Sequence, residues 1–309
     1  MAPHAVGVDI GGTTIKAGRV APDGRLTETR QFPTPTDVTE LLHRVRELVE
    51  DCGVEGDLVG LVTAGLTDEG TGRVMYSANL GWRDVPLRDL AAEALGRPIA
   101  FGHDVRGAAL AESRWGVGMS DMLLVPVGTG VASALVLRGR VRGTGWAGEI
   151  GQVLVVDPDA GRDAGADSAG RTAARLPLEQ VCSAAAIARR YAALVGEPDT
   201  TGGARHVIDR VREGDTSARW VVETATAALA DALAAGVGLL GPVTIVLGGG
   251  LAEAGEDILR PLRAALDERL PAQARPRLDV AALGRWSGCL GAAALALTDT
   301  AEPTGGASS

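Results

Sequence analysis

The feature of this 309-residue chain that most limits its fold is an apolar strand that ends in a glycine turn and returns as a second strand. This pattern opens the chain in VGVDIGGTTIKAGRV, residues 6–20, and recurs more weakly in MLLVPVGTGVASALVLRG, residues 122–139. Apolar residues at helical spacing follow the first copy at 37–52, so strands and helices alternate. The sequence therefore predicts an α/β fold with two related domains, each beginning with a hairpin.

Turn signals and apolar periodicity divide the rest of the chain into further elements. Strands are predicted at 26–32, 58–65, 99–101, 243–250 and 278–283, and helices at 84–95, 217–240, 255–269 and 287–297. Residues 157–175 are predicted to form a low-complexity loop, and the tail after Leu297 is expected to be disordered.

Composition limits the possible partners. The formal net charge is -9 and the isoelectric point is near 5.1, which argues against a nucleic-acid partner, because such a partner requires a basic face. Met1–Ala5 shows no basic region before an apolar run, and no stretch reaches the roughly 18 apolar residues of a membrane span. A soluble cytoplasmic protein is expected, and Cys52, Cys182 and Cys289 fit buried reduced thiols.

The first glycine turn carries residues suited to a phosphate chain. Gly11 and Gly12 leave backbone N–H groups open to approach, and Thr13 and Thr14 add hydroxyl donors. Asp9, at the end of the first strand, can hold Mg²⁺ through water. The alternative for this loop alone is a tight hairpin with a hydrogen-bonded aspartate. Two more glycine runs, at 127–130 and 247–250, also end apolar strands, and turn geometry alone does not readily explain three such loops.

Asp104, in FGHDVRGAAL, lies where a strand is predicted to end and a helix to begin. It is either the N-cap of that helix or a general base that faces a substrate hydroxyl. Strand ends line the ligand crevice of open α/β sheets, which favours the base. His103 is either a substrate contact or a packing residue. Glu149 and Glu179 are isolated acids, for which an exposed or capping role is the default.

Several motifs together resemble the ROK family of bacterial sugar kinases. They are VDIGGTTIKAG, HDVRGAALAE, GTGVA, GEIG, LEQVCSAAAIARR and VLGGGLAEAGEDILRPLR, in the family's order and spacing, from about Val6 to Leu297. The resemblance implies a two-domain actin/hexokinase-like (ribonuclease H-like) α/β fold with an interdomain cleft. Residues 1–115 plus 286–298 would form a small domain, 116–285 a large domain and 299–309 a disordered tail.

The resemblance also implies roles for individual residues. The first phosphate loop would comprise Asp9, Gly11, Gly12, Thr13, Thr14 and Lys16, the second Gly128, Thr129 and Gly130, and Gly248, Gly249 and Gly250 would lie by the adenosine. Asp104 would accept the proton of a sugar hydroxyl. The other sugar contacts would be Asn79, His103, Glu149, Gln152 and Glu179. ATP and Mg²⁺ would be the cofactors, with Asp9 holding Mg²⁺ through water.

The chain departs from the family pattern at three places. It reads HDVR where the family usually has NDAN, GEIGQ where the family has GEIGH, and GRTAARLPLE where a CxCGxxGCxE stretch usually binds zinc. The matching zinc positions are Gly170, Thr172, Pro177 and Gln152, so no structural zinc is expected. The aspartates of the 157–175 loop lack the spacing of an EF-hand. His103 and Gln152 leave the identity of the sugar open.

The expected activity is an ATP-dependent hexose kinase that phosphorylates the 6-hydroxyl of glucose or N-acetylglucosamine. A non-catalytic, sugar-sensing ROK-type regulator or pseudokinase is the alternative. The regulators carry a DNA-binding domain before the phosphate loop, whereas five residues precede the first strand here. A hexose or amino sugar is the expected small-molecule partner. Neither nucleic acid nor a membrane is expected as a partner, a homodimer is possible, and polyphosphate in place of ATP stays open.

Overall fold

The computed structural model describes residues 3–160, 174–197 and 202–299, which form two compact units. Among these residues, the first unit takes in 3–122, 134–147 and 282–299, and the second takes in the rest. The sequence prediction placed the whole of 116–285 in one domain, whereas 116–122, 134–147 and 282–285 group with the first unit. Most of the predicted 157–175 loop, and the tail beyond 299, lie outside the described residues.

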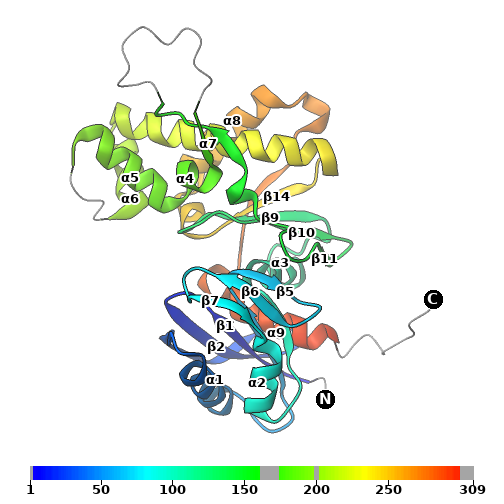
Figure 1. Cartoon of the computed structure of the whole chain (residues 1–309). Helices are drawn as coiled ribbons and strands as arrows, with labels where there is room; N and C mark the ends of the chain where they lie inside the picture. Colours follow the sequence, from blue (N-terminus) through cyan, green and yellow to red (C-terminus); the bar gives the residue numbers. More distant parts are fainter. Residues whose placement is uncertain (1–2, 161–173, 198–201, 300–309) are drawn as a thin grey trace. The chain divides into compact units, whose positions relative to one another are not determined.

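The first unit is built on a five-stranded sheet with the order β3-β2-β1-β4-β8. Figure 1 labels its strands β1 and β2. Its strands are β1 (Ala5–Ile10), β2 (Thr14–Val20), β3 (Leu26–Pro33), β4 (Leu58–Thr63) and β8 (Ala100–His103). Strands β1, β2 and β3 form an antiparallel meander. Strands β1, β4 and β8 are parallel to one another. The carboxyl ends of these parallel strands therefore lie at one edge of the sheet.

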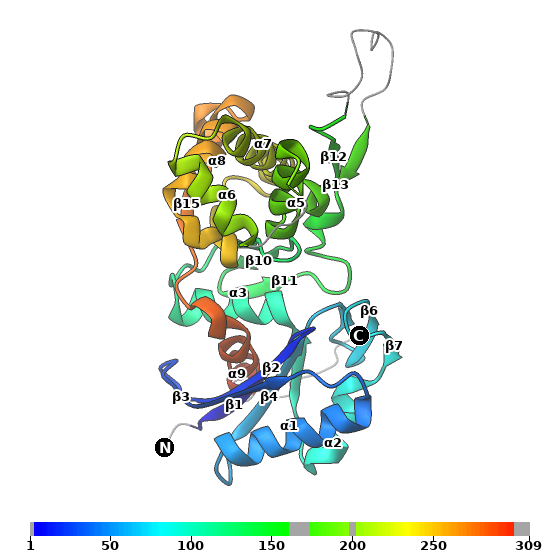
Figure 2. The same ribbon diagram turned by 90° about the vertical axis from the view of Figure 1, so that its left-hand side faces the viewer.

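Helices α1 (Val38–Cys52) and α9 (Ser287–Asp299) cover opposite faces of this sheet (Figure 2). The apolar face of α1 packs in one core cluster with Val6, Val8 and Ile10 of β1. Gly7 of β1 and Gly60 of β4 lie on the other face of the sheet, where a Cβ on either residue would meet α9. A Cβ on either glycine would overlap a backbone carbonyl oxygen of α9, so this helix lies directly on the strand backbones.

Further elements of the first unit extend the sequence prediction and correct it. Strands β5 (Leu66–Asp68), β6 (Arg73–Ser77) and β7 (Trp82–Val85) form a small sheet. The unit also contains helices α2 (Leu87–Leu95) and α3 (Asp104–Trp115). A hairpin is formed by β10 (Ala134–Leu137) and β11 (Arg140–Arg142). The helix predicted at 84–95 begins only at Leu87, because Pro86 precedes it and β7 occupies the earlier residues. The strand predicted at 99–101 continues to His103.

The second unit combines three strands of one sheet with a group of helices. The strands are β9 (Met122–Pro126), β14 (Thr244–Gly248) and β15 (Leu278–Val280), consecutive in that order. Only Met122, the first residue of β9, groups with the first unit. The helices are α4 (Leu178–Cys182), α5 (Ala184–Val195), α6 (Gly203–Arg212), α7 (Thr216–Leu240) and α8 (Glu256–Arg269), and an antiparallel pair joins β12 (Leu154–Val156) to β13 (Arg175–Pro177). Short 3₁₀ turns complete the unit, among them η1 (Ile150–Gln152) and η2 (Gly250–Ala254).

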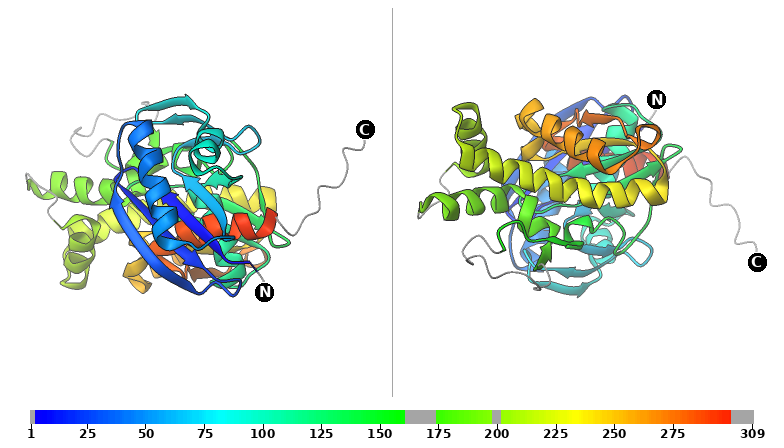
Figure 3. Two further views of the ribbon diagram at one scale, coloured as in Figure 1. Left: turned by 90° about the horizontal axis from the view of Figure 1, so that it is seen from below. Right: turned by 90° about the horizontal axis from the view of Figure 1, so that it is seen from above.

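Helix α7 is the long helix of the second unit and lies beside α8, as the right-hand view of Figure 3 shows. Its length and composition would suffice to cross a membrane, but 56% of its most apolar window is buried within the structure. Leu229 and Leu233 are among its buried residues, and the helix also packs against α4 and α5. This burial is typical of a core helix in a globular unit.

Candidate active site

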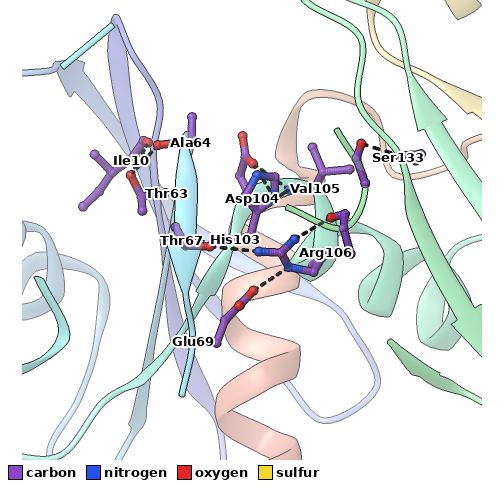
Figure 4. Close-up of polar contacts among 12 residues, drawn as sticks. Ile10, Thr63, Ala64, Thr67, Glu69, His103, Asp104, Val105, Arg106 and Ser133 are labelled. Atoms are coloured by element: carbon purple, nitrogen blue, oxygen red, sulfur yellow. Dashed lines mark hydrogen bonds and ion pairs between the residues drawn. The ribbon is translucent and has the colours of Figure 1, made fainter. Parts of the chain in front are cut away.

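Three parallel strands of the first unit end in polar residues. Asp9 is the penultimate residue of β1, Thr63 ends β4, and His103 ends β8 directly before Asp104. In the sheet register Thr63 pairs with Ile10 on one side and with His103 on the other. These side chains therefore gather at the edge where open α/β sheets bind ligands. Figure 4 shows Thr63, His103 and Asp104 in this region.

Asp9 is a buried carboxylate with one basic neighbour. Its Oδ2 lies 3.6 Å from Nζ of Lys16, which extends from the paired position on β2. A Cβ on Gly288 would overlap the carboxylate, so Asp9 touches the first turn of α9, where the helix dipole favours a negative charge. Burial and the nearby Asp104 raise the pKa of Asp9 to about 6, and Lys16 opposes them. The charge of Asp104 acts on Asp9, and the oxygens of both carboxylates are ligands that suit a hard divalent cation.

Asp104 is the first residue of α3, and the preceding residue, His103, is the N-cap of this helix. Nδ1 of His103 accepts the N–H of Val105 at 3.1 Å, which makes His103 the N-cap. The same N–H approaches Oδ1 of Asp104 at 2.7 Å (Figure 4). The N-cap alternative considered for Asp104 is thus wrong. About 30% of the Asp104 side chain remains accessible, although burial raises its pKa to about 6 against the opposing effects of Val105 N–H and Arg106.

His103 is neutral in this environment. Burial and the Arg106 charge lower its pKa to about 3, and the Glu69 charge opposes them. Because Nδ1 accepts a hydrogen bond, the ring proton is assigned to Nε2. The 3.2 Å separation between Nδ1 and Oδ1 of Asp104 is therefore not an ion pair between charged groups. A neutral ring can still donate one hydrogen bond from Nε2 to a ligand.

Arg106 is the residue near Asp104 that the sequence analysis missed. It is 5% exposed, and it donates to Oε1 of Glu69 and to Oγ1 of Thr67 at 2.9 Å (Figure 4). It also donates to the carbonyl oxygen of Ala147 at 2.9 Å. The second carboxylate oxygen of Glu69 is buried without a hydrogen-bond partner. Arg106 thus joins the start of α3 to β5 and to the segment after β11. The one signal in the sequence was that HDVR places arginine where the family usually has asparagine.

The first glycine loop closes the β1–β2 hairpin. The N–H of Gly11 donates to the carbonyl of Thr14 at 3.1 Å, and the carbonyl of Thr13 accepts the N–H of Thr34 at 3.0 Å. A Cβ on Gly11 would lie 2.9 Å from the Thr14 carbonyl oxygen, so the turn itself needs this glycine. Gly12 lies against Asn79, whose Cβ would be 2.8 Å from a Cβ on the glycine. The structure therefore brings Asn79 beside this loop.

The two other glycine loops belong to the second unit and pack against each other. The N–H of Val127 donates to the Gly248 carbonyl at 2.9 Å, and the Val127 carbonyl accepts the N–H of Leu251 at 3.1 Å. Gly249 has a φ of 75° and lies so close to Val127 that a Cβ would overlap it, so this position requires glycine. By contrast, a Cβ on Gly128 or Gly250 would meet no atom within 4 Å, so packing does not explain these two glycines.

The acidic candidates of the second unit lie near its first glycine loop. Nε2 of Gln152 donates to Oε1 of Glu179 at 2.9 Å, and the other oxygen of Glu179 would lie 3.3 Å from a Cβ on Gly130. Thr129 lies in the same loop. The carbonyl of Gly128 accepts the N–H of Ala184 at the start of α5. Glu149 immediately precedes η1, which contains Gln152. Gln152 and Glu179 therefore form a pair beside the loop.

Only part of the zinc-matching segment can be described. Gly170 and Thr172, and likewise Asp163 and Asp167, lie outside the described residues. Pro177 is the last residue of β13, and Gln152 bonds Glu179, so neither offers a usual zinc ligand. The described ranges hold no group of three or more His, Cys, Asp or Glu side chains placed for a metal. Burial raises the pKa of Cys52 to about 11 and that of Cys182 to about 12, and these thiols are protonated.

Comparison with known proteins identifies the family. A sequence profile of the ROK family matches residues 5–299, and the chain belongs to this family. The glucokinase of Halalkalibacterium halodurans is 32% identical, over 93% of this chain and 92% of that protein. Both the family and the α/β fold class predicted from the sequence are confirmed.

Solved structures agree with that assignment. The ROK hexokinase of Thermus thermophilus superposes with a TM-score of 0.79 at 31% identity, over 97% of this chain and 100% of that one. A ROK family glucokinase from Streptomyces griseus, solved in complex with glucose and AMPPNP, gives a TM-score of 0.75 at 28% identity, over 96% and 99% of the two chains.

Proposed function

We propose that this protein is an ATP-dependent hexose kinase that phosphorylates the 6-hydroxyl of glucose or N-acetylglucosamine. The observation that carries the proposal is Asp104, a partly accessible carboxylate at the end of β8 in a chain of the ROK family. Glucose is the first acceptor to test, because the most similar relatives reported above include glucokinases and a complex with glucose.

Asp104 is the proposed general base. In the ionised form it accepts the proton of the sugar 6-hydroxyl while that oxygen attacks the γ-phosphorus of ATP, and ADP leaves. A pKa of about 6 leaves the carboxylate largely ionised at neutral pH and still basic enough to take the proton. Val105 N–H and the charge of Arg106 stabilise the ionised form. The neutral ring of His103 adds no competing positive charge beside it.

Asp9 is the proposed holder of Mg²⁺, through water. Its carboxylate oxygens are hard ligands, and it adjoins the glycine turn that we assign to phosphate binding. When bound, the cation would neutralise phosphate charge during transfer. Lys16, the single lysine of the chain, and the hydroxyls of Thr13 and Thr14 would contact the same phosphates.

The second unit is proposed to bind the rest of the nucleotide. Thr129 and its flanking glycines would form the second phosphate loop, and Gly248–Gly250 would lie by the adenosine. A pocket of about 110 Å³ beside Gly250 supports this, because its lining combines apolar and charged side chains. Those residues are Ala204, Arg205, Ile208, Asp209, Arg212, Gly250, Leu251, Glu253 and Ala254.

The sugar contacts are proposed to be Asn79 and His103 in the first unit and Glu149, Gln152 and Glu179 in the second. The bond from Gln152 to Glu179 supports a joint role, since it orients a carboxylate that can accept from two sugar hydroxyls. A cytoplasmic location and a homodimer stay expectations.

A coupled ADP-release assay tests the function. Glucose, N-acetylglucosamine, N-acetylmannosamine, mannose and fructose are each supplied with ATP and Mg²⁺, and polyphosphate replaces ATP in a parallel series. Sugar-dependent ADP release supports the kinase. Sugar binding by calorimetry without ADP release would instead favour the non-catalytic alternative.

Replacing Gly128 with valine should weaken ATP binding and leave the fold intact. The new side chain meets no protein atom within 4 Å at its Cβ, so it would occupy the space into which a phosphate approaches the backbone. Calorimetric titration with ATP and Mg²⁺ measures the effect. Gly238→Val, at an exposed glycine of α7 that is equally free of neighbours, is the matched control and should bind ATP like the wild type. Equal ATP affinity in both variants would remove this loop from the nucleotide site.

The purified protein should contain no stoichiometric zinc. Pro177 and Gln152 supply neither thiolate nor imidazole at two of the four matching positions, and four such ligands form a structural zinc site. Activity should return fully after chelator treatment and addition of Mg²⁺. Elemental analysis that finds about one zinc per chain, lost together with activity on chelation, would contradict this expectation.

A further inference from the structure

Arg190 of α5 is a buried charge that links three segments of the second unit. Its Nε donates to Oδ2 of Asp159 at 2.7 Å, its Nη1 to the carbonyl of Val181 at 3.1 Å, and its Nη2 to Oγ1 of Thr224 at 2.7 Å. The residue is 7% exposed, and its guanidinium lies 5.4 Å from the ring centre of Trp220. A buried charge with this many partners fixes the segments that supply them.

Two of these segments carry the paired residues Gln152 and Glu179. Val181 belongs to α4, which also contains Glu179, and Asp159 follows β12, which begins shortly after Gln152. The contacts therefore form a closed path. It runs from Glu179 along α4 to Arg190, across to Asp159, back along β12 to Gln152, and through the 2.9 Å amide bond to Glu179.

Helix α4 depends on such external support. It has five residues, too few to be stable alone, and the carbonyl groups of its last turn lack partners within the helix. Arg190 satisfies the carbonyl of Val181, and Nη2 of the neighbouring Arg189 donates to the carbonyl of Gln180 at 2.9 Å. The N–H of Leu178 also donates to the Val153 carbonyl at 2.8 Å, which attaches the start of α4 to the β12 side.

We propose that Arg190 and Asp159 are positioning residues that hold Glu179 and Gln152 in the orientation needed to bind the sugar. The proposal rests on the proposed function, because it gives that function's sugar-binding pair its support. It also explains what could hold this segment in place, since Gln152 and Pro177 do not fit the zinc site that the family pattern implies. In this chain an ion pair between α5 and the turn after β12 would hold the segment rigid.

The variants Asp159→Asn and Arg190→Met test the proposal. Asp159 is partly exposed, so its amide variant should fold, and it removes the charge opposite Arg190 while keeping the side-chain shape. The matched control is Asp231→Asn, which removes the partner of Arg269 at 2.6 Å between α7 and α8 of the same unit. Asp231 is exposed to a similar degree and lies outside the closed path.

Two measurements decide the outcome. Asp159→Asn should raise the KM for the sugar by about tenfold, with the KM for ATP unchanged, because only the sugar-binding pair loses its orientation. Hydrogen exchange should speed up for the backbone amides of residues 176–183 in Asp159→Asn and Arg190→Met, and stay at the wild-type rate in Asp231→Asn. In Asp159→Asn, either a sugar KM within twofold of the wild type or unchanged exchange would overturn the proposal.

The exchange measurement also separates the two hypotheses. If the wild type turns over none of the sugars, the proposed kinase fails, and exchange alone then decides whether the ion pair fixes α4. If Arg190→Met does not fold, Asp159→Asn carries the test, since the charge it removes is partly solvated. Unchanged exchange in that variant would contradict the proposal even in an active enzyme.

Discussion

Asp104→Asn is expected to lower kcat by roughly 10²–10⁴ while the affinity for sugar changes much less. The amide keeps the shape of the side chain, and its oxygen can still accept the Val105 N–H that Oδ1 accepts at 2.7 Å. An amide cannot take the hydroxyl proton, so the loss falls on the chemical step. Steady-state kinetics with glucose and saturating ATP measure kcat, and calorimetry measures sugar binding separately.

Asp37→Asn is the matched control for this change. Asp37 belongs to the same unit and also accepts a backbone N–H, that of Glu40 at 2.9 Å as the N-cap of α1. Its amide variant should keep the wild-type kcat. Wild-type activity should also fall as the pH drops below about 6, because protonated Asp104 cannot act as a base. More than about a tenth of the wild-type kcat in Asp104→Asn would refute the base assignment.

Gly60→Ala is expected to destabilise the first unit by about 3 kcal/mol, the upper part of the range for overpacking. A Cβ on Gly60 would overlap the carbonyl oxygen of Ala292 in α9, and the backbone of a helix cannot turn aside as a side chain can. Chemical denaturation followed by tryptophan fluorescence is a suitable measurement, since Trp82, Trp115 and Trp286 all lie in this unit. The midpoint should fall with little change in the slope.

Gly102→Ala provides the comparison for that result. Gly102 lies in β8 of the same sheet and also faces α9, but its added Cβ would meet the end of the Leu295 side chain at 2.6 Å. This side chain can change rotamer, so the loss should be about 1 kcal/mol. Equal losses in the two variants would mean that the direct contact between α9 and the strand backbones does not limit packing here.

Long periodic segments were predictable from the sequence because their apolar spacing is set by the helix or strand itself. Helices 217–240 and 255–269 agree with α7 and α8 within one residue at each end. The small sheet of β5, β6 and β7 was not predicted. Its strands are three to five residues long and are separated by turns, so no run is long enough to show a period of two.

The strand ends gave the positions of Asp9 and Asp104, because a carboxylate after an apolar run is visible in one sequence. The ion pairs beside Asp104 and beside the Gln152–Glu179 pair were not visible in the sequence. Arg106 and Glu69 are 37 residues apart, and Arg190 and Asp159 are 31 apart, so each partner reads as an ordinary surface charge. Such pairs are specified by tertiary packing, and a single sequence carries no local signal for them.

The place of α9 in the chain has a consequence for biosynthesis. This helix covers the glycine-bearing face of β1 and β4, yet it is the last described element, after the whole of the second unit has been translated. A nascent chain on the ribosome therefore presents an uncovered sheet face throughout that interval, the kind of surface that chaperones bind. Strands β1 and β4 therefore complete their unit only after α9 has emerged.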